Sequence, residues 1–169
     1  APLSRTTPHP ALDSYLRLAE TLGCEASDRQ MHLAVSKTDE ATWRAIRARQ
    51  SDVLGPRDYI CLNPGGAFGA AKHWPSQLFA ELARKIVTTT ELAVVVVCGP
   101  AERDEASEIV VLAHDPRVVS LAEEPLSLGL TKAVIRHSRA LVTTDSGPRH
   151  FAAPFGIPAV TLFGPTHIA

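Results

Sequence analysis

Short apolar runs alternate with longer segments of helical apolar spacing from residue 58 to the end of the chain. The short runs are typical of buried strands, and the longer segments are typical of helices that pack with one face inward. A regular alternation of the two predicts an α/β fold in which helices cover both faces of a parallel sheet. The five strand candidates are residues 58–63, 93–98, 117–121, 140–144 and 159–163.

Two of the intervening helices have clear start signals. Pro75 precedes a segment whose apolar residues would face the sheet, and these are Leu78, Phe79, Leu82, Ala83 and Ile86. Ser127 can cap a helix that carries Leu130, Ala133, Val134 and His137. Pro148 stands where a first-turn proline is tolerated.

The first 57 residues have a different pattern. Leu12, Leu16, Ala19 and Leu22 form one apolar stripe that ends at a plausible glycine cap, Gly23. Residues 31–35 alternate like a short strand.

A second helix is predicted from about residue 39 to residue 50, introduced by Ser36 or Thr38 and containing Trp43 and Ile46. Its arginines are Arg44, Arg47 and Arg49. They suit either a basic partner surface or a solvated helix face, and the solvated face is favoured.

The turn that follows the fourth strand candidate is a candidate anion site. Asp145, Ser146 and Gly147 form a tight turn before a helix start, which points backbone N–H groups at one spot near the positive end of that helix. His150, about one turn later, can add a donor to the same anion. Ordinary helix capping explains the same residues, and the turn alone does not separate the two interpretations.

A glycine-rich loop at 63–75 follows the first strand candidate. Small residues let the backbone approach a ligand closely, and Lys72 supplies a compact positive charge of the kind used against phosphates. The loop has neither Walker nor dinucleotide-fingerprint spacing, and a surface loop with a solvated lysine is its alternative.

Topology predicts that the two glycine motifs meet. In the usual doubly wound strand order 3-2-1-4-5, ligands enter at the carboxyl ends of the first and fourth strands, where the order reverses. Those two strands are followed by the loop 63–75 and the turn 144–150. The sequence therefore predicts a crevice for a phosphate-bearing ligand between them.

Four motifs in order give the chain a family resemblance. They are the loop 64–75 ending in Lys-His-Trp-Pro, Cys-Gly-Pro-Ala-Glu at 98–102, Thr-Asp-Ser-Gly-Pro-Arg-His at 144–150 and Phe-Gly-Pro-Thr at 163–166. Together they resemble the ADP-heptose:lipopolysaccharide heptosyltransferase family. The resemblance implies a Rossmann-like domain at 58–169, the nucleotide-sugar-binding half of a GT-B glycosyltransferase, preceded by connector and lead-in helices at 1–57. It also implies that the acceptor domain is missing and that the C-terminus is truncated.

Individual residues receive roles from the motifs and the resemblance. Lys72 is expected to neutralise the diphosphate and stabilise the leaving group, and the backbone N–H groups of Ser146 and Gly147 are expected to donate to it, with His150 close by. Asp145 orients either the sugar or the turn itself.

Two further residues have an equally plausible structural role. Glu102 suits two ribose hydroxyls, as the resemblance supports, or is a surface glutamate at a helix start. Leu126 aligns with the family's apolar contact to adenine, or is a core leucine.

The resemblance implies transfer of heptose from ADP-heptose to the lipopolysaccharide inner core with inversion of configuration, at the cytoplasmic face of the inner membrane. ADP-heptose is then a donor substrate, and no cofactor is expected. Such transfer needs a general base, which the family holds in the acceptor half, so this chain alone is predicted to be inactive. Peripheral membrane association fits the full enzyme.

Composition excludes only a few classes of protein. The 169 residues have a net charge of −1 and 45% hydrophobic content, so the overall balance does not point to nucleic acid. Cys24, Cys61 and Cys98 indicate reduced core thiols, and the histidines show no metal-ligand spacing, so no metal is proposed. Two alternatives stay open: a nucleotide-sugar epimerase of similar architecture and a non-catalytic nucleotide-binding module.

Overall fold

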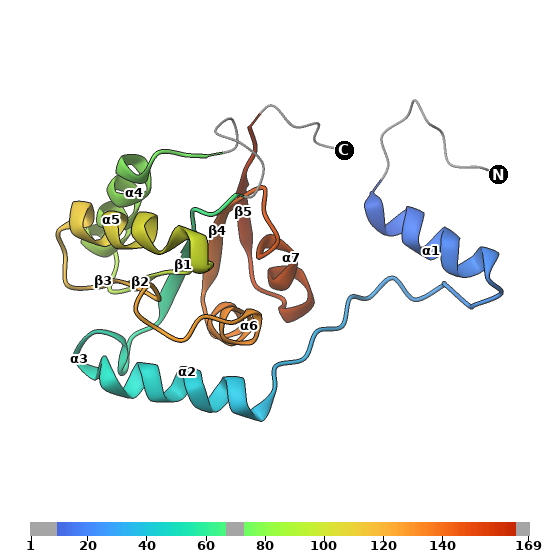
Figure 1. Ribbon diagram of the computed structural model, residues 1–169, viewed down its shortest axis with the longest axis horizontal. Coiled ribbons are helices and arrows are strands. Elements are labelled where there is room, and N and C mark those ends of the chain that lie inside the picture. Colours follow the sequence, from blue (N-terminus) through green and yellow to red (C-terminus); the bar gives the residue numbers. More distant parts are fainter. Residues whose placement is uncertain (1–9, 67–72, 165–169) are drawn as a thin grey trace. The chain divides into compact units, whose positions relative to one another are not determined.

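The computed structural model describes residues 10–66 and 73–164 (Figure 1). The chain separates into two compact units, residues 1–31 with 166–169 and residues 32–165. In the first unit the described residues form one helix, α1 (Ala11–Thr21). Gly23 follows it with a φ of 81°, the left-handed conformation that glycine adopts without strain, which confirms the predicted cap.

Five parallel strands form the sheet of the second unit, in the order β3-β2-β1-β4-β5. Each strand falls within its predicted range, and the predicted reversal of order between the first and fourth strands is confirmed. The register places Asn63 beside Thr143 at the carboxyl ends of two neighbouring strands. The strands are β1 (Tyr59–Asn63), β2 (Ala93–Val96), β3 (Val118–Ser120), β4 (Ala140–Thr144) and β5 (Ala159–Leu162).

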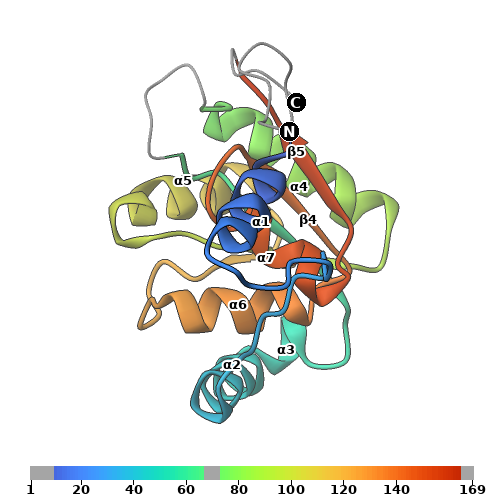
Figure 2. The same ribbon diagram turned by 90° about the vertical axis from the view of Figure 1, so that its right-hand side faces the viewer.

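Helices cover both faces of this sheet, as predicted (Figures 1 and 2). α4 and α5 pack against each other on one face, while α6 and α7 lie on the other, with α2 packed against α6. None of the described helices has the length and apolar character needed to cross a membrane. The elements are α2 (Lys37–Arg49), α3 (Ser51–Leu54), α4 (Ser76–Thr89), α5 (Arg103–Ala113), α6 (Leu128–Arg136), α7 (Arg149–Ala152) and the 3₁₀ turns η2 (Pro100–Glu102) and η3 (Ala153–Phe155).

The start signals of two helices work as predicted. The Ser36 hydroxyl accepts from the backbone N–H of Asp39 at the start of α2, and the Ser127 hydroxyl accepts from that of Leu130 at the start of α6. α6 then buries one full face against the sheet, so its position, and that of the loop before it, is fixed by packing.

α2 is part of the core of the sheet unit. Trp43 and Ile46 are each 1% exposed. The Trp43 ring meets the Tyr59 ring edge-on with centroids 5.5 Å apart, and the Tyr59 hydroxyl donates to the Val134 carbonyl over 2.7 Å. The predicted connector role of residues 1–57 stays a prediction, but α2 and α3 fold with the sheet.

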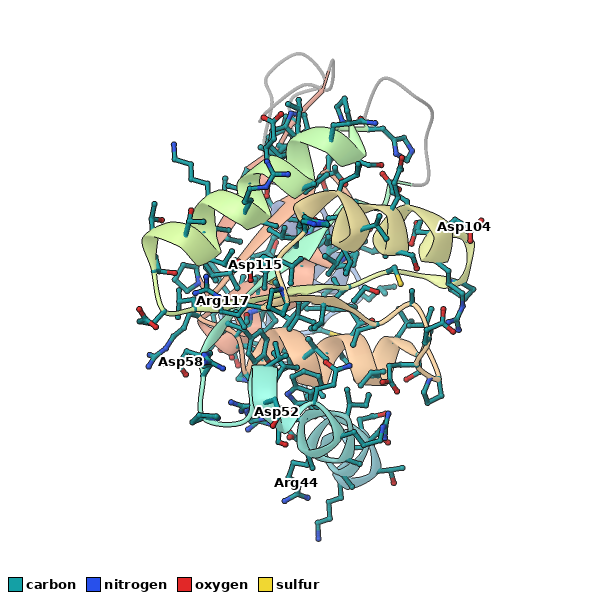
Figure 3. All side chains as sticks on the ribbon, turned by 90° about the vertical axis from the view of Figure 1, so that its left-hand side faces the viewer. Arg44, Asp52, Asp58, Asp104, Asp115 and Arg117 are labelled. Atoms are coloured by element: carbon teal, nitrogen blue, oxygen red, sulfur yellow. The ribbon has the colours of Figure 1, made fainter. Side chains whose placement is uncertain are left out.

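The arginines of α2 do not share the single role expected of them. Arg47 donates to three backbone carbonyls, those of Leu54, Gly55 and Arg57, and Arg49 pairs with Glu124 at 2.6 Å. Arg44 and Arg49 are exposed, as the favoured solvated-face interpretation expects, and Figure 3 shows Arg44 projecting from the helix. That interpretation is wrong for Arg47, which is only partly exposed and binds the segment that follows α2.

Three smaller predictions are also wrong. Residues 31–35 form no strand, because no described strand pairs with them, and Val35 instead packs on the core beside α6. Leu78 is 37% exposed, since the inward face of α4 is set by Phe79, Ala80, Ala83 and Val87. Cys24 is exposed, whereas Cys61 and Cys98 are buried as expected.

The two ends of the strands differ in character. Figure 3 shows Asp58, Asp115 and Arg117 at the end where the strands begin, and Asp104 at the opposite end, where α5 starts. At the first end, Asp58 pairs with Arg139 at 2.6 Å and Asp115 with Arg117 at 3.3 Å, which leaves that edge occupied by surface ion pairs. The loops at the carboxyl ends of the strands hold the cavity described next.

Candidate functional site

A crevice of about 390 Å³ opens at the carboxyl ends of the strands. It is bordered by the loops that follow β1, β2 and β4 and by the start of α6. Its described lining residues are Asn63, Gly65, Gly66, Cys98, Gly99, Pro100, Glu102, Leu126, Ser127, Leu128, Thr131, Ser146, Gly147 and Pro148. The predicted crevice at the reversal of strand order is therefore present.

Buried hydrogen bonds join the loops after β1 and β4. The Thr144 hydroxyl donates to the Gly65 carbonyl. The Asn63 amide donates to the Thr143 hydroxyl over 2.8 Å and to the Ser146 hydroxyl over 2.7 Å. Because these polar groups are fully or almost fully buried apart from Ser146, leaving them unpaired is costly, and the two loops are held together.

Glu102 lies between the loops after β1 and β2. Its Oε2 accepts from the Gly99 backbone N–H over 2.5 Å and closes the turn η2. A Cβ built on Gly65 would lie 2.8 Å from Glu102 Oε1, and one on Gly99 would lie 2.7 Å from Oε2. Glu102 therefore stands at a helix start, as one interpretation of the sequence has it, and it also lines the crevice, while its contact with ribose hydroxyls stays a prediction.

Because Gly65 has no side chain, it is expected to leave the room that the Glu102 carboxylate occupies. Gly65→Ala should push the Glu102 side chain aside, since a side chain yields more easily than backbone; on the expectation from sequence that the crevice takes an ADP moiety, ADP affinity should fall roughly tenfold, the worth of one charge-assisted hydrogen bond. Calorimetric titration with ADP measures this. The matched control compares Glu102→Ala with the double variant Glu102→Ala and Gly65→Ala, because no carboxylate remains there to be displaced. A further tenfold loss in that background would contradict the explanation.

The turn after β4 differs in part from the prediction. The backbone N–H of Ser146 donates to the Thr144 carbonyl over 2.8 Å, so it is not available to an anion. Ser146 instead lines the crevice and can reach it through its hydroxyl. The Gly147 N–H has no partner among the described residues and remains a candidate donor. α7 has only four residues, so the dipole expected of a full helix is small here.

Asp145 and His150 lie outside the set of residues that line the crevice. Arg149 contacts both of them, since its Nη1 is 3.0 Å from Asp145 Oδ1 and its Nε donates to His150 Nε2 over 3.2 Å. Desolvation by burial and the neighbouring Arg149 charge lower the pKa of His150. Arg149 also stacks on Phe163 at 5.4 Å and therefore ties the turn to the end of β5.

Leu126 is a core leucine that also borders the crevice, and its contact with adenine stays a prediction. It is partly buried, packs against the clusters on both faces of the sheet and lines the crevice. Lys72 lies outside the described residues, so its role stays a prediction from sequence. Within the described part of the chain, no group of His, Cys, Asp and Glu side chains is arranged to hold a metal ion.

Comparison with known proteins decides the family. Residues 4–169 match the model of glycosyltransferase family 9, the heptosyltransferases. The chain belongs to this family. Lipooligosaccharide heptosyltransferase 2 of Haemophilus influenzae is 32% identical over 139 residues, which are 80% of this chain and 39% of that protein. The chain thus spans about two fifths of the length of this curated relative.

Solved structures of the family share the fold. The glycosyl transferase family 9 protein from Veillonella parvula DSM 2008 matches with a TM-score of 0.76 at 27% identity, over 99% of this chain and 47% of that one. The Escherichia coli ADP-heptose lipopolysaccharide heptosyltransferase II matches with a TM-score of 0.67 at 29% identity, over 80% and 40%. The predicted fold class, half of a GT-B glycosyltransferase, is confirmed.

The roles of several polar residues in this family 9 chain were not predicted from its sequence. Asn63, Thr143 and Thr144 lie at the ends of apolar strands, and such polar positions point to a buried network once the strand order is known. Thr131, which lines the crevice, gave no comparable signal, because its neighbours on α6 are those of an ordinary core helix.

Proposed function

We propose that this chain forms the nucleotide-sugar-binding half of a heptosyltransferase that moves heptose from ADP-heptose to the lipopolysaccharide inner core. The observation that carries the proposal is the crevice where the loops after β1 and β4 meet, within a region that matches family 9. The name of the E. coli relative, which includes ADP-heptose, supports the choice of donor.

The crevice offers a suitable group to each part of a nucleoside diphosphate. Ser146 and Gly147 line the crevice, and we assign the Ser146 hydroxyl and the Gly147 N–H to the diphosphate, together with Lys72, which is assigned from the sequence alone. Glu102 Oε1, the oxygen that is not bonded to Gly99, is proposed to accept from a ribose hydroxyl. Leu126 supplies apolar surface for the adenine.

This half would act in catalysis by stabilising the departing ADP. Negative charge grows on the diphosphate as the bond to the sugar breaks, so donors already in place lower the barrier. Inversion requires direct attack by an acceptor hydroxyl and a general base to take its proton. We assign that base and the lipopolysaccharide acceptor surface to the remaining length found in the relatives, and membrane association at the inner face to the whole enzyme.

The nucleotide preference of the chain tests this proposal. ADP should bind more tightly than UDP, GDP or NAD, because Leu126 offers apolar surface for the adenine and the E. coli relative is named for ADP-heptose. Calorimetric titration of the four ligands, at equal ionic strength, measures the order of affinity. Equal binding of ADP, UDP and GDP, or no binding of ADP, would contradict the assignment.

A further inference from the structure

Asn63 is a buried amide at the floor of the crevice, and its surroundings give it a definite hydrogen-bond direction. The residue is 3% exposed and lies at the end of β1, in register with Thr143 of β4. Its Nδ2 lies 2.8 Å from Thr143 Oγ1 and 2.7 Å from Ser146 Oγ. One amide group therefore contacts two hydroxyls on the opposite loop.

Thr143 fixes which end of the amide faces the hydroxyls. Its single hydroxyl hydrogen is donated to the Thr144 carbonyl over 2.9 Å. Thr143 Oγ1 must then accept from Asn63, which requires the NH₂ end of the amide on this side. The second hydrogen of the same NH₂ group points to Ser146, so Ser146 Oγ is an acceptor as well.

The Ser146 hydroxyl keeps its own hydrogen in this arrangement. Among the described residues, the hydroxyl near Ser146 Oγ is Thr143 Oγ1, 3.4 Å away. This distance is long for a hydrogen bond between two hydroxyls, and Thr143 Oγ1 already accepts from Asn63. Ser146 lines the crevice, so the hydrogen is left for a ligand there. An ionised phosphate oxygen, which only accepts hydrogen bonds, is the matching partner.

We propose that Asn63 is a positioning residue that presents the Ser146 hydroxyl as a donor to the diphosphate of the bound nucleotide. The inference rests on the proposed function, because the ligand is the same ADP moiety. Asn63 does not touch the ligand through this contact. It sets the orientation of the Ser146 hydroxyl before the ligand arrives, which lowers the cost of ordering that group on binding.

Asn63→Asp is the most informative variant, because it keeps the size of the side chain and reverses its hydrogen bonding. A carboxylate only accepts, so the Ser146 hydrogen would turn to the new carboxylate and away from the crevice. ADP affinity should fall about 10- to 100-fold, as expected for a lost hydrogen bond to a charged group, while adenosine affinity stays within about twofold. Calorimetric titrations with ADP and adenosine measure both.

The pH profile separates positioning from a purely structural role. Once protonated, the carboxyl group introduced by Asn63→Asp carries one O–H donor, and burial at a position that is 3% exposed raises the pKa of a carboxyl group, so ADP affinity of the variant should recover as the pH is lowered, beyond any change in the wild type. Other titratable groups around the crevice are Cys98, Glu102, Asp145 and His150, and the wild-type profile accounts for them. An ADP affinity loss that is independent of pH would overturn the inference.

A double-mutant cycle gives the second readout. Ser146→Ala should lower ADP affinity about tenfold, and adding Asn63→Ala to it should change the affinity by less than about twofold. Additive losses would overturn the inference. Thr143→Val tests the step that orients the amide, because it removes the acceptor that fixes the NH₂ end toward the hydroxyls; ADP affinity should fall, but by less than in Asn63→Asp.

Failure of the inference is distinct from failure of the proposed function. If the wild-type chain does not bind ADP, the proposed function fails and this inference with it. If the wild type binds ADP while Asn63→Asp loses ADP and adenosine equally, only the positioning role fails. Selective, pH-reversible loss in Asn63→Asp together with a non-additive cycle supports it.

Discussion

Trp43→Ala is expected to lower the free energy of unfolding of this chain by about 3–5 kcal/mol, the range found when large buried aromatic rings are truncated. The indole is 1% exposed and packs edge-on against Tyr59, so its removal leaves a cavity between α2 and the sheet. The helix around it is held by Arg47 and Arg49, which limits how far the site can collapse. Urea unfolding followed by circular dichroism measures the change.

Arg44→Ala is the matched control on the same helix. Arg44 neighbours Trp43 in sequence but is exposed, so its truncation should change the free energy of unfolding by less than about 0.5 kcal/mol. Similar small effects for both variants would mean that α2 is a loosely attached connector and that the packing described for Trp43 does not hold the fold.

Lys72→Ala is expected to weaken ADP binding by about 1.5–3 kcal/mol while leaving the fold intact. Lys72 is the cation of the glycine-rich loop, and removing a charge-assisted contact to phosphate costs more than removing a neutral one. The loss should appear with ADP and not with adenosine, which has no phosphate. Calorimetric titration of both ligands measures the difference.

Lys85→Ala provides the control for charge alone. Lys85 is exposed on α4 and is not among the residues that line the crevice, so it should change ADP affinity only through weak, screened electrostatics. Equal losses of ADP and adenosine in Lys72→Ala, or an equal ADP loss in Lys85→Ala, would show that Lys72 does not recognise the diphosphate.

The fold could be predicted because its strongest signals are local in sequence. Each strand is a short apolar run, and the order of the strands is the usual one for doubly wound sheets. The crevice could be predicted for the same reason, since strand order alone brings Asn63 and Thr143 to the same edge. Residues 31–35 show the limit of such signals, because alternation predicts a strand only where a neighbouring strand is available.

The details of the site depend on contacts that the pattern of apolar and polar residues does not specify. The Ser146 N–H is occupied because the turn brings it to the Thr144 carbonyl. Arg47 is held because the segment after α2 brings the Leu54 carbonyl to its guanidinium. Arg149 received no role from the sequence, because its contacts with Asp145, His150 and Phe163 depend on the course of the turn before α7 and of the end of β5. Donor and acceptor assignments of this kind require coordinates.

Mapping bound ADP on the chain tests the central claim most directly. ADP titrated into the ¹⁵N-labelled chain should shift the backbone amide signals of Gly65, Gly99, Ser146 and Gly147 most strongly, because these residues line the crevice between the loops after β1, β2 and β4. Shifts confined to α1 and α2, or no saturable shifts in the crevice, would contradict the assignment of this crevice to the nucleotide diphosphate.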